Sequence, residues 1–164
     1  MGRRILHTGP IGSASVLKVV TNYLATANLA ALAEAFVVAQ KAGMDMNTTY
    51  EAIRVSSGNS FVHDTESQVI LNGSRDINFT MDLVVKDVGL FEKLARINEV
   101  PVEISPLILK IFEDGRDRYG SREFSPNIIK RLEEACGIRI LGTGFPAEMT
   151  DDEPEAAGYG EKPN

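Results

Sequence analysis

Residues 9–22 combine a glycine-bearing turn with two polar side chains that could do chemistry. Lys18 and Asn22 stand four residues apart in a segment with helical spacing, so an ammonium and an amide share one helical face. A lysine in a partly apolar cleft can give a proton to a carbonyl oxygen or take one from a hydroxyl. Asn22 offers a donor and an acceptor to the same substrate. Spacing alone favours the alternative, in which Lys18 reaches solvent and Asn22 bonds a neighbouring helix.

A second group of residues comprises Phe79 and the pair Lys86 and Asp87. Phe79 precedes Lys86 by seven residues, about two turns, so a continuous helix would place both on one face. Lys86 could neutralise a phosphate of a bound cofactor, and Asp87 could pair nearby. The alternative, which the pattern alone favours, is a solvated ion pair on an amphipathic helix.

The charge of the chain is unevenly distributed. The 164 residues carry a formal net charge of −6, and residues 148–164 contain six acidic side chains and one lysine. The remainder is nearly neutral and has no basic stripe interleaved with aromatic residues, so we expect no nucleic-acid partner. No apolar run approaches the length of a membrane span, so we also expect no membrane partner.

Histidine and cysteine usage points to neither a metal nor a disulfide. His7 and His63 have no metal-ligand spacing with acidic residues or with Cys136, and we expect no metal site. A single cysteine cannot form an internal disulfide, and a reducing, cytoplasmic compartment is the simplest setting.

The elements that must position these residues are helices. The pattern from Ser13 to about Ala42 is helical for roughly thirty residues and apolar nearly all round, which predicts burial within the domain, between subunits, or both. Shorter helices are expected over residues 47–55, 61–71, 79–98, 104–118 and 125–136. We therefore predict an all-α fold, a helical bundle organised around one long central helix.

Three stretches divide the chain. Residues 4–8 have the pattern of a short strand, and a strand without partners is not stable. Either this segment is irregular here, or the other strands of its sheet are made by residues absent from this chain. Residues 9–141 are expected to form the helical domain, and residues 142–164 an acidic, flexible tail.

The two motifs together resemble those of the β-hydroxyacid dehydrogenases, the 3-hydroxyisobutyrate dehydrogenase and tartronate-semialdehyde reductase group related to 6-phosphogluconate dehydrogenase. The signature G-x-x-G-x-G-x-x-x-K-x-x-x-N corresponds here to Gly9, Gly12, Ala14, Lys18 and Asn22. A second signature, K-D-L-x-L-A, corresponds to residues 86–91, with Phe79 at the expected offset. Ala14 replaces the third glycine, and Phe91 replaces a small residue.

The resemblance implies a role for each residue of the two motifs. The catalytic acid and base would be Lys18. The residues that bind substrate would be Asn22, Gly9 and Gly12. The residues that bind the cofactor, at its nicotinamide end, would be Lys86, Phe79 and Asp87.

The resemblance also implies that NAD or NADP is bound mainly by an N-terminal Rossmann domain, whose G-x-G-x-x-G motif does not occur here. Residues 1–8 would be the remnant last strand of that domain. We expect the chain to be the C-terminal catalytic and dimerisation domain of an NAD(P)-dependent 3-hydroxyacid dehydrogenase. It would form a homodimer or a higher homo-oligomer, act on a small 3-hydroxy acid, and be inactive alone. The alternative is a non-catalytic helical dimerisation module.

Overall fold

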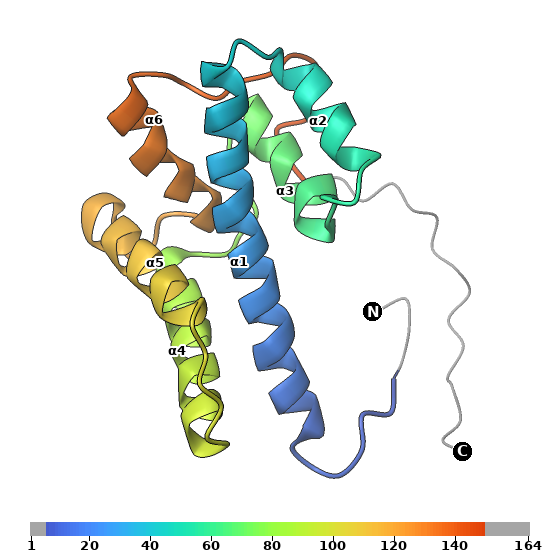
Figure 1. Ribbon diagram of the computed structural model, residues 1–164, viewed down its shortest axis with the longest axis vertical. Helices are drawn as coiled ribbons and strands as arrows, with labels where there is room; N and C mark the ends of the chain where they lie inside the picture. The colour runs from blue at the N-terminus through green and yellow to red at the C-terminus, as the bar shows by residue number, and fades with distance from the viewer. Residues whose placement is uncertain (1–5, 150–164) are drawn as a thin grey trace.

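The computed structural model describes residues 6–149, and within this range the chain is helical (Figure 1). The helices are α1 (Ser13–Lys41), α2 (Met46–Arg54), α3 (Phe61–Asn72), α4 (Met81–Ile97), α5 (Ser105–Tyr119), the 3₁₀-helix η1 (Ser125–Ile129) and α6 (Lys130–Cys136). Among the described residues there is no strand, only isolated bridges that pair Asp76 with Glu148 and Thr80 with Phe124. The expected all-α class is confirmed.

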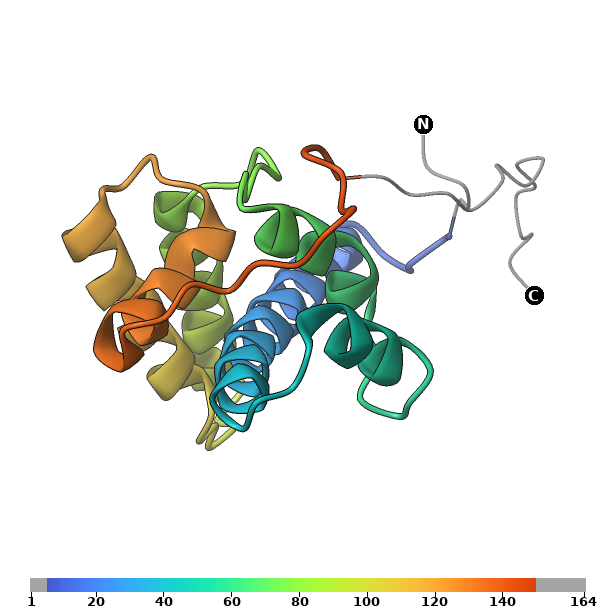
Figure 2. The same cartoon turned by 90° about the horizontal axis from the view of Figure 1, so that it is seen from above.

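Helix α1 has 29 residues and contacts every other helix. Seen from above, it lies between α2 and α3 on one side and α4, α5 and α6 on the other (Figure 2). It begins after Gly12, whose φ of 101° only glycine adopts readily, and no side chain caps its first turn. The Ser13 hydroxyl instead donates to the Pro10 carbonyl at 2.8 Å.

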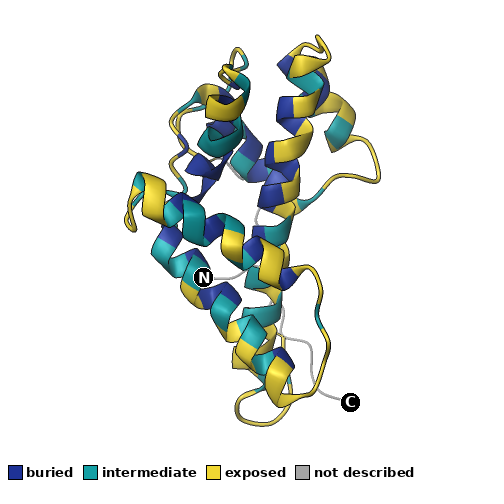
Figure 3. Ribbon diagram, turned by 60° about the vertical axis from the view of Figure 1, so that its left-hand side comes forward, coloured by how far each residue is buried: buried dark blue, intermediate teal, exposed yellow. Residues whose placement is uncertain are grey.

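Burial along α1 is uneven within this chain, and burial between subunits, the other part of the prediction, stays a prediction. Its buried residues begin at Thr26, and the hydrophobic core gathers around its C-terminal half (Figure 3). In the N-terminal half, Val16 and Leu24 are 44% and 53% exposed. This half therefore presents apolar side chains that no described residue covers.

By length and composition alone, α1 is apolar enough to cross a membrane, with 28% of the relevant window buried. The expectation that no apolar run reaches such a length is therefore wrong. One such helix is weak evidence for a membrane span, because long core helices pass the same test. Here α1 packs against five other helices and η1.

The segment predicted as one helix over residues 125–136 has two parts. It begins as the 3₁₀-helix η1, which carries Pro126 in its first turn, and continues as α6 to Cys136. Gly137 ends α6 with a φ of 63°. The five residues of η1 are all buried, so this turn belongs to the core.

The two ends of the described range differ from expectation. Residues 6–8 have no regular structure, and residues 1–5, the rest of the predicted strand, lie outside the described residues. Residues 142–149 lie against α3: the Gly142 N–H donates to the Leu71 carbonyl at 2.9 Å, and the Asn72 amide donates to the Phe145 carbonyl at 2.8 Å. The Phe145 ring also contacts Tyr50, so the predicted tail does not begin at residue 142. Its remainder, residues 150–164, lies outside the described residues.

Candidate active site

The buried carboxylate of Asp87 on α4 brings together four of the residues predicted to form a site. Its side chain is 4% exposed. Oδ2 accepts a hydrogen bond of 2.5 Å from the Asn22 amide and lies 3.4 Å from Lys18 Nζ. Lys86 Nζ lies 3.2 Å from Oδ1, a distance for an ion pair, although the contact does not meet hydrogen-bond geometry. Lys18, Asn22 and Lys86 thus converge on one carboxylate.

The packing of α1 against α4 accounts for this convergence. Lys18 and Asn22 stand one turn apart on α1, on the face that packs against α4. The Tyr23 and Phe91 rings stack between the same two helices, with centroids 3.9 Å apart. Phe91, the departure from the family pattern, therefore serves helix packing beside the site.

The electrostatics of the site favour an ionised Asp87. Burial acts to raise the pKa of this carboxyl, but the hydrogen bond from Asn22 and the ammonium groups of Lys86 and Lys18 outweigh it, so the pKa is lowered. The two lysines remain largely at the surface, with side chains 63% and 56% exposed for Lys18 and Lys86. Each ammonium group therefore contacts Asp87 on one side and is open to a ligand on its solvent-exposed side.

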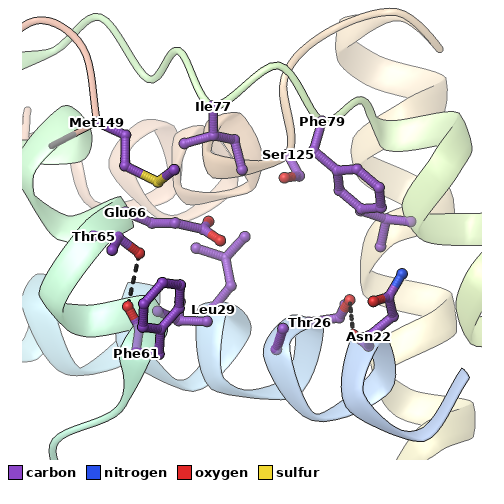
Figure 4. Close-up of a pocket in the computed structure, with 13 residues that line it drawn as sticks. Asn22, Thr26, Leu29, Phe61, Thr65, Glu66, Ile77, Phe79, Ser125 and Met149 are labelled. Atoms are coloured by element: carbon purple, nitrogen blue, oxygen red, sulfur yellow. Dashed lines mark hydrogen bonds between the residues drawn. The ribbon is translucent and has the colours of Figure 1, made fainter. Parts of the chain in front are cut away.

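Phe79 lies outside the helix that was predicted to contain it. It precedes α4, which begins at Met81, so it does not share a helical face with Lys86. Its backbone is instead held by η1, because the Ser125 N–H donates to the Phe79 carbonyl at 2.8 Å. The expected face-sharing is wrong, yet the Phe79 ring lines a cavity together with Asn22 (Figure 4).

The two glycines of the first motif lie in the turn before α1. Gly9 and Gly12 have φ values of 110° and 101°, a region that other residues adopt with strain. Neither lines the cavity beside Asn22. Their conformation explains the need for glycine in this turn, and their binding of substrate stays a prediction.

The cavity beside Asn22 has a volume of about 260 Å³. Its walls come from α1, α3, the start of α4, η1 and Met149, and most of its lining is apolar. The ionisable member of the lining is Glu66 on α3, which extends into the cavity (Figure 4). Glu66 is not among the residues that the sequence predicts for a site. A signal exists, because Val62, Glu66 and Ile70 are spaced by four residues, and Val62 and Ile70 are buried.

Glu66 is a carboxyl group in an apolar setting. Its Oε2 atom is buried and makes no hydrogen bond with any residue that the structure describes. Burial raises the pKa of Glu66 from 4.5 to about 7. The folded protein therefore holds this carboxyl in its neutral form over a pH range in which the unfolded chain ionises it.

This pKa shift predicts how the free energy of unfolding changes with pH. A raised pKa contributes stability that is fully present below pH 4.5 and is lost as the pH rises through 7. Relative to Glu66→Gln, the wild type should therefore lose up to about 3 kcal/mol between pH 4.5 and pH 8. Urea unfolding at the two pH values measures the difference. Glu103→Gln, which removes an exposed carboxylate, is the matched control, and an equal pH response in both variants would contradict the prediction.

The part of the chain that the structure describes contains no group of three or more His, Cys, Asp or Glu side chains that could hold a metal ion. The residues present do fit a nicotinamide cofactor. Lys18 and Lys86 offer two exposed cations, and Phe79 offers an aromatic ring in the lining of a largely apolar cavity. Cationic and aromatic side chains are the groups that phosphates and a flat heterocycle require.

The chain is similar to known hydroxyacid dehydrogenases in sequence and in fold. The chain belongs to the family whose model is described as "NAD-binding of NADP-dependent 3-hydroxyisobutyrate dehydrogenase", which matches residues 12–132. The description assigns NAD binding to the matched segment itself, whereas the sequence analysis expected it mainly on another domain. Cofactor binding by residues of this chain is therefore the part of the expectation that the family supports.

Two similar proteins are named as dehydrogenases. The 2-(hydroxymethyl)glutarate dehydrogenase of Eubacterium barkeri is 34% identical over 143 residues, covering 87% of this chain and 48% of that protein. The NAD-dependent L-serine dehydrogenase of Pseudomonas aeruginosa is 31% identical over 140 residues, covering 80% and 46%. The chain thus spans about half the length of these relatives.

Solved structures show the same fold. The 3-hydroxyisobutyrate dehydrogenase from Salmonella typhimurium superposes with a TM-score of 0.65 at 28% identity, covering 73% of this chain and 42% of that one. The Mycobacterium tuberculosis 3-hydroxyisobutyrate dehydrogenase superposes with a TM-score of 0.70 at 24% identity, covering 78% and 46%. At that identity, the second likeness concerns the fold alone.

Proposed function

We propose that this chain supplies the catalytic, C-terminal part of an NAD(P)-dependent 3-hydroxyacid dehydrogenase, with Lys18 as general acid and base. The observation that carries the proposal is the cluster at Asp87. A buried carboxylate that fixes a lysine and an asparagine one turn apart positions both groups for one small substrate.

The division of labour follows from the contacts. When bound, NAD(P) would supply the acceptor or donor of the hydride exchanged with the hydroxyl-bearing carbon of the substrate. Lys18 accepts the hydroxyl proton during oxidation, as the neutral amine, and gives it back during reduction. Asn22 uses its amide nitrogen on Asp87, which leaves its Oδ1 as an acceptor that orients the substrate hydroxyl.

Asp87 positions other residues of the site, and Lys86 contributes positive charge. Asp87 is a positioning residue, because its carboxylate holds both Lys18 and Asn22. The exposed ammonium of Lys86 adds a second positive charge beside Lys18. Together the two cations favour a substrate or cofactor group that is anionic.

The chain by itself is expected to show little or no turnover, because a dehydrogenase site also needs the residues that hold the rest of the cofactor. The test compares two proteins: the chain alone, and the chain joined to the N-terminal half of the Eubacterium barkeri relative, of which it matches about half. Both are assayed with NAD and NADP on several 3-hydroxy acids. Turnover by the chain alone at the rate of the joined protein would contradict the proposal.

We also propose a homo-oligomer located in the cytoplasm. The apolar N-terminal half of α1, with Val16, Leu17 and Leu24 exposed, is a surface of the kind that a second subunit covers. A single free cysteine suits a reducing compartment. The same surface is the feature that favours the alternative, a non-catalytic dimerisation module.

A further inference from the structure

Glu66 presents an unusual chemical situation inside the cavity beside Asn22. Its Oε2 atom is buried, faces the cavity and has no hydrogen-bond partner among the described residues. A buried polar atom without a partner is costly, more so when it carries charge. Such a group within a cavity is one that a bound ligand can satisfy.

Three neighbouring polar side chains in the cavity make their own hydrogen bonds elsewhere, and the Ser125 hydroxyl, which also lines it, makes none with Glu66 Oε2. The Thr65 hydroxyl donates to the Phe61 carbonyl at 2.7 Å, and the Thr26 hydroxyl donates to the Asn22 carbonyl at 2.9 Å. The Asn22 amide nitrogen is held by Asp87 at 2.5 Å. The cavity therefore offers a ligand mainly acceptors, Glu66 at one end and Asn22 Oδ1 at the other (Figure 4).

The charges of the residues that line the cavity also favour a ligand that donates hydrogen bonds and is cationic. Glu66 is the only ionisable side chain among the described residues that line the cavity, and no lysine, arginine or histidine is among them. A carboxylate or phosphate placed here would meet a carboxyl group and no cation. An ammonium would instead form a charge-assisted hydrogen bond in a weakly polar setting, where such bonds are strong.

We propose that this cavity selects a substrate whose far end carries an ammonium group, and that Glu66 is the specificity-determining residue that binds it. The substrate class is then a small 3-hydroxy acid with a positively charged substituent. Its hydroxyl-bearing carbon lies at Lys18 and Asn22, and its methylene groups lie against Leu29 and Ile77. The placement of the reacting end rests on the proposed function, while the recognition of the ammonium does not.

The test measures binding to the chain itself, so that it needs no turnover. Three probes of one length and shape are titrated at pH 8 and constant ionic strength: 1-butylammonium, 1-butanol and butyrate. Chemical shifts of the methyl groups of Leu29, Ile77 and Met149 report binding in the cavity. Butylammonium is expected to bind about tenfold or more tightly than butanol, the factor that one charge-assisted hydrogen bond supplies, and butyrate most weakly.

Glu66→Gln isolates the role of the carboxylate. It keeps the shape of the side chain, and should lower the affinity for butylammonium about tenfold while leaving the affinity for butanol unchanged. Glu103→Gln removes an exposed negative charge outside the cavity and should match the wild type. Equal binding of butanol and butylammonium, a preference for butyrate, unchanged binding in Glu66→Gln, or no binding of any probe would each overturn the proposal.

Failure here is distinguishable from failure of the proposed function. The function is judged by turnover of the joined protein, and the ammonium site by binding of probes to this chain. If the joined protein oxidises 3-hydroxy acids but the chain does not bind butylammonium, the proposed dehydrogenase function stands and the proposed ammonium site is wrong. If the joined protein shows no turnover but the chain binds butylammonium, the ammonium site stands and the dehydrogenase function is wrong.

Discussion

Replacing Lys18 by alanine in the dehydrogenase assembled from this chain and a relative's N-terminal half is expected to lower kcat about 10²–10⁴-fold. The reason is that a positioned acid and base contributes a factor of this size to proton transfer. The Lys18 ammonium is held 3.4 Å from Asp87 at the open side of the cluster, in reach of a ligand. Steady-state rates in both directions, with substrate and cofactor saturating, measure the effect.

Two further variants separate proton transfer from charge. Lys18→Arg keeps the positive charge beside Asp87 but cannot give up its proton, so it should remain as slow as Lys18→Ala. Lys41→Ala removes a lysine from the far end of the same helix and should leave kcat unchanged within about twofold. A loss of only a few-fold in Lys18→Ala would instead favour the non-catalytic module. Recovery of the rate in Lys18→Arg would reduce Lys18 to a binding charge.

The part of the site that lies on one helix could be predicted from the sequence. Lys18 and Asn22 share a face because a helix has 3.6 residues per turn, and this periodicity holds wherever the helix packs. The convergence of Lys86 and Asp87 on the same point depends on how α4 packs against α1. No local pattern contains that information, and the resemblance supplied it.

The prediction for Phe79 shows where periodicity fails. Its spacing from Lys86 suits a helix, but α4 begins only at Met81, since the preceding backbone pairs with η1 through the bond from Ser125. That bond joins segments more than forty residues apart in the sequence. Helix boundaries set by such distant contacts are not visible in a local pattern.

Neither the burial of Glu66 nor the packing of residues 142–149 against α3 was predicted, because residue type and composition suggest that both are exposed. Charged residues are normally exposed, so a lone glutamate on a weakly amphipathic helix is predicted to lie at the surface. The Gly- and Pro-rich composition after residue 141 likewise suggests a tail. A single aromatic ring, Phe145, and a few backbone hydrogen bonds suffice to hold residues 142–149 against α3.

A buried ion pair between Arg75 and Glu133 provides the second large expected effect, on stability rather than on rate. Arg75 follows α3 and Glu133 lies in α6, and their side chains are 1% and 5% exposed. Arg75 Nη2 donates to Glu133 Oε1 at 2.6 Å, and the same oxygen accepts the Ile140 N–H at 2.7 Å. The pair therefore ties α3, α6 and the segment that follows α6 together.

Arg75→Met should lower the free energy of unfolding by about 3–5 kcal/mol, because it leaves the Glu133 carboxylate buried without its counter-charge. The control is Arg54→Met, which breaks the exposed pair between Arg54 and Glu51 and should cost less than about 1 kcal/mol. Urea unfolding, followed by circular dichroism at one pH, compares the two. A cost for Arg75→Met no larger than that for Arg54→Met would contradict the buried pair.

The double variant Arg75→Met with Glu133→Gln should recover stability to within about 1 kcal/mol of the wild type, although it contains no ion pair. The physical reason lies in the wild-type geometry: Nε and Nη1 of Arg75 have no hydrogen-bond partner among the described residues, so the guanidinium is only partly compensated. Glutamine keeps an acceptor for the Ile140 N–H, and methionine fills the space of the arginine stem. A double variant as unstable as Arg75→Met would instead assign the pair a net stabilising role beyond mutual neutralisation, because removing both charges would then cost as much as removing one.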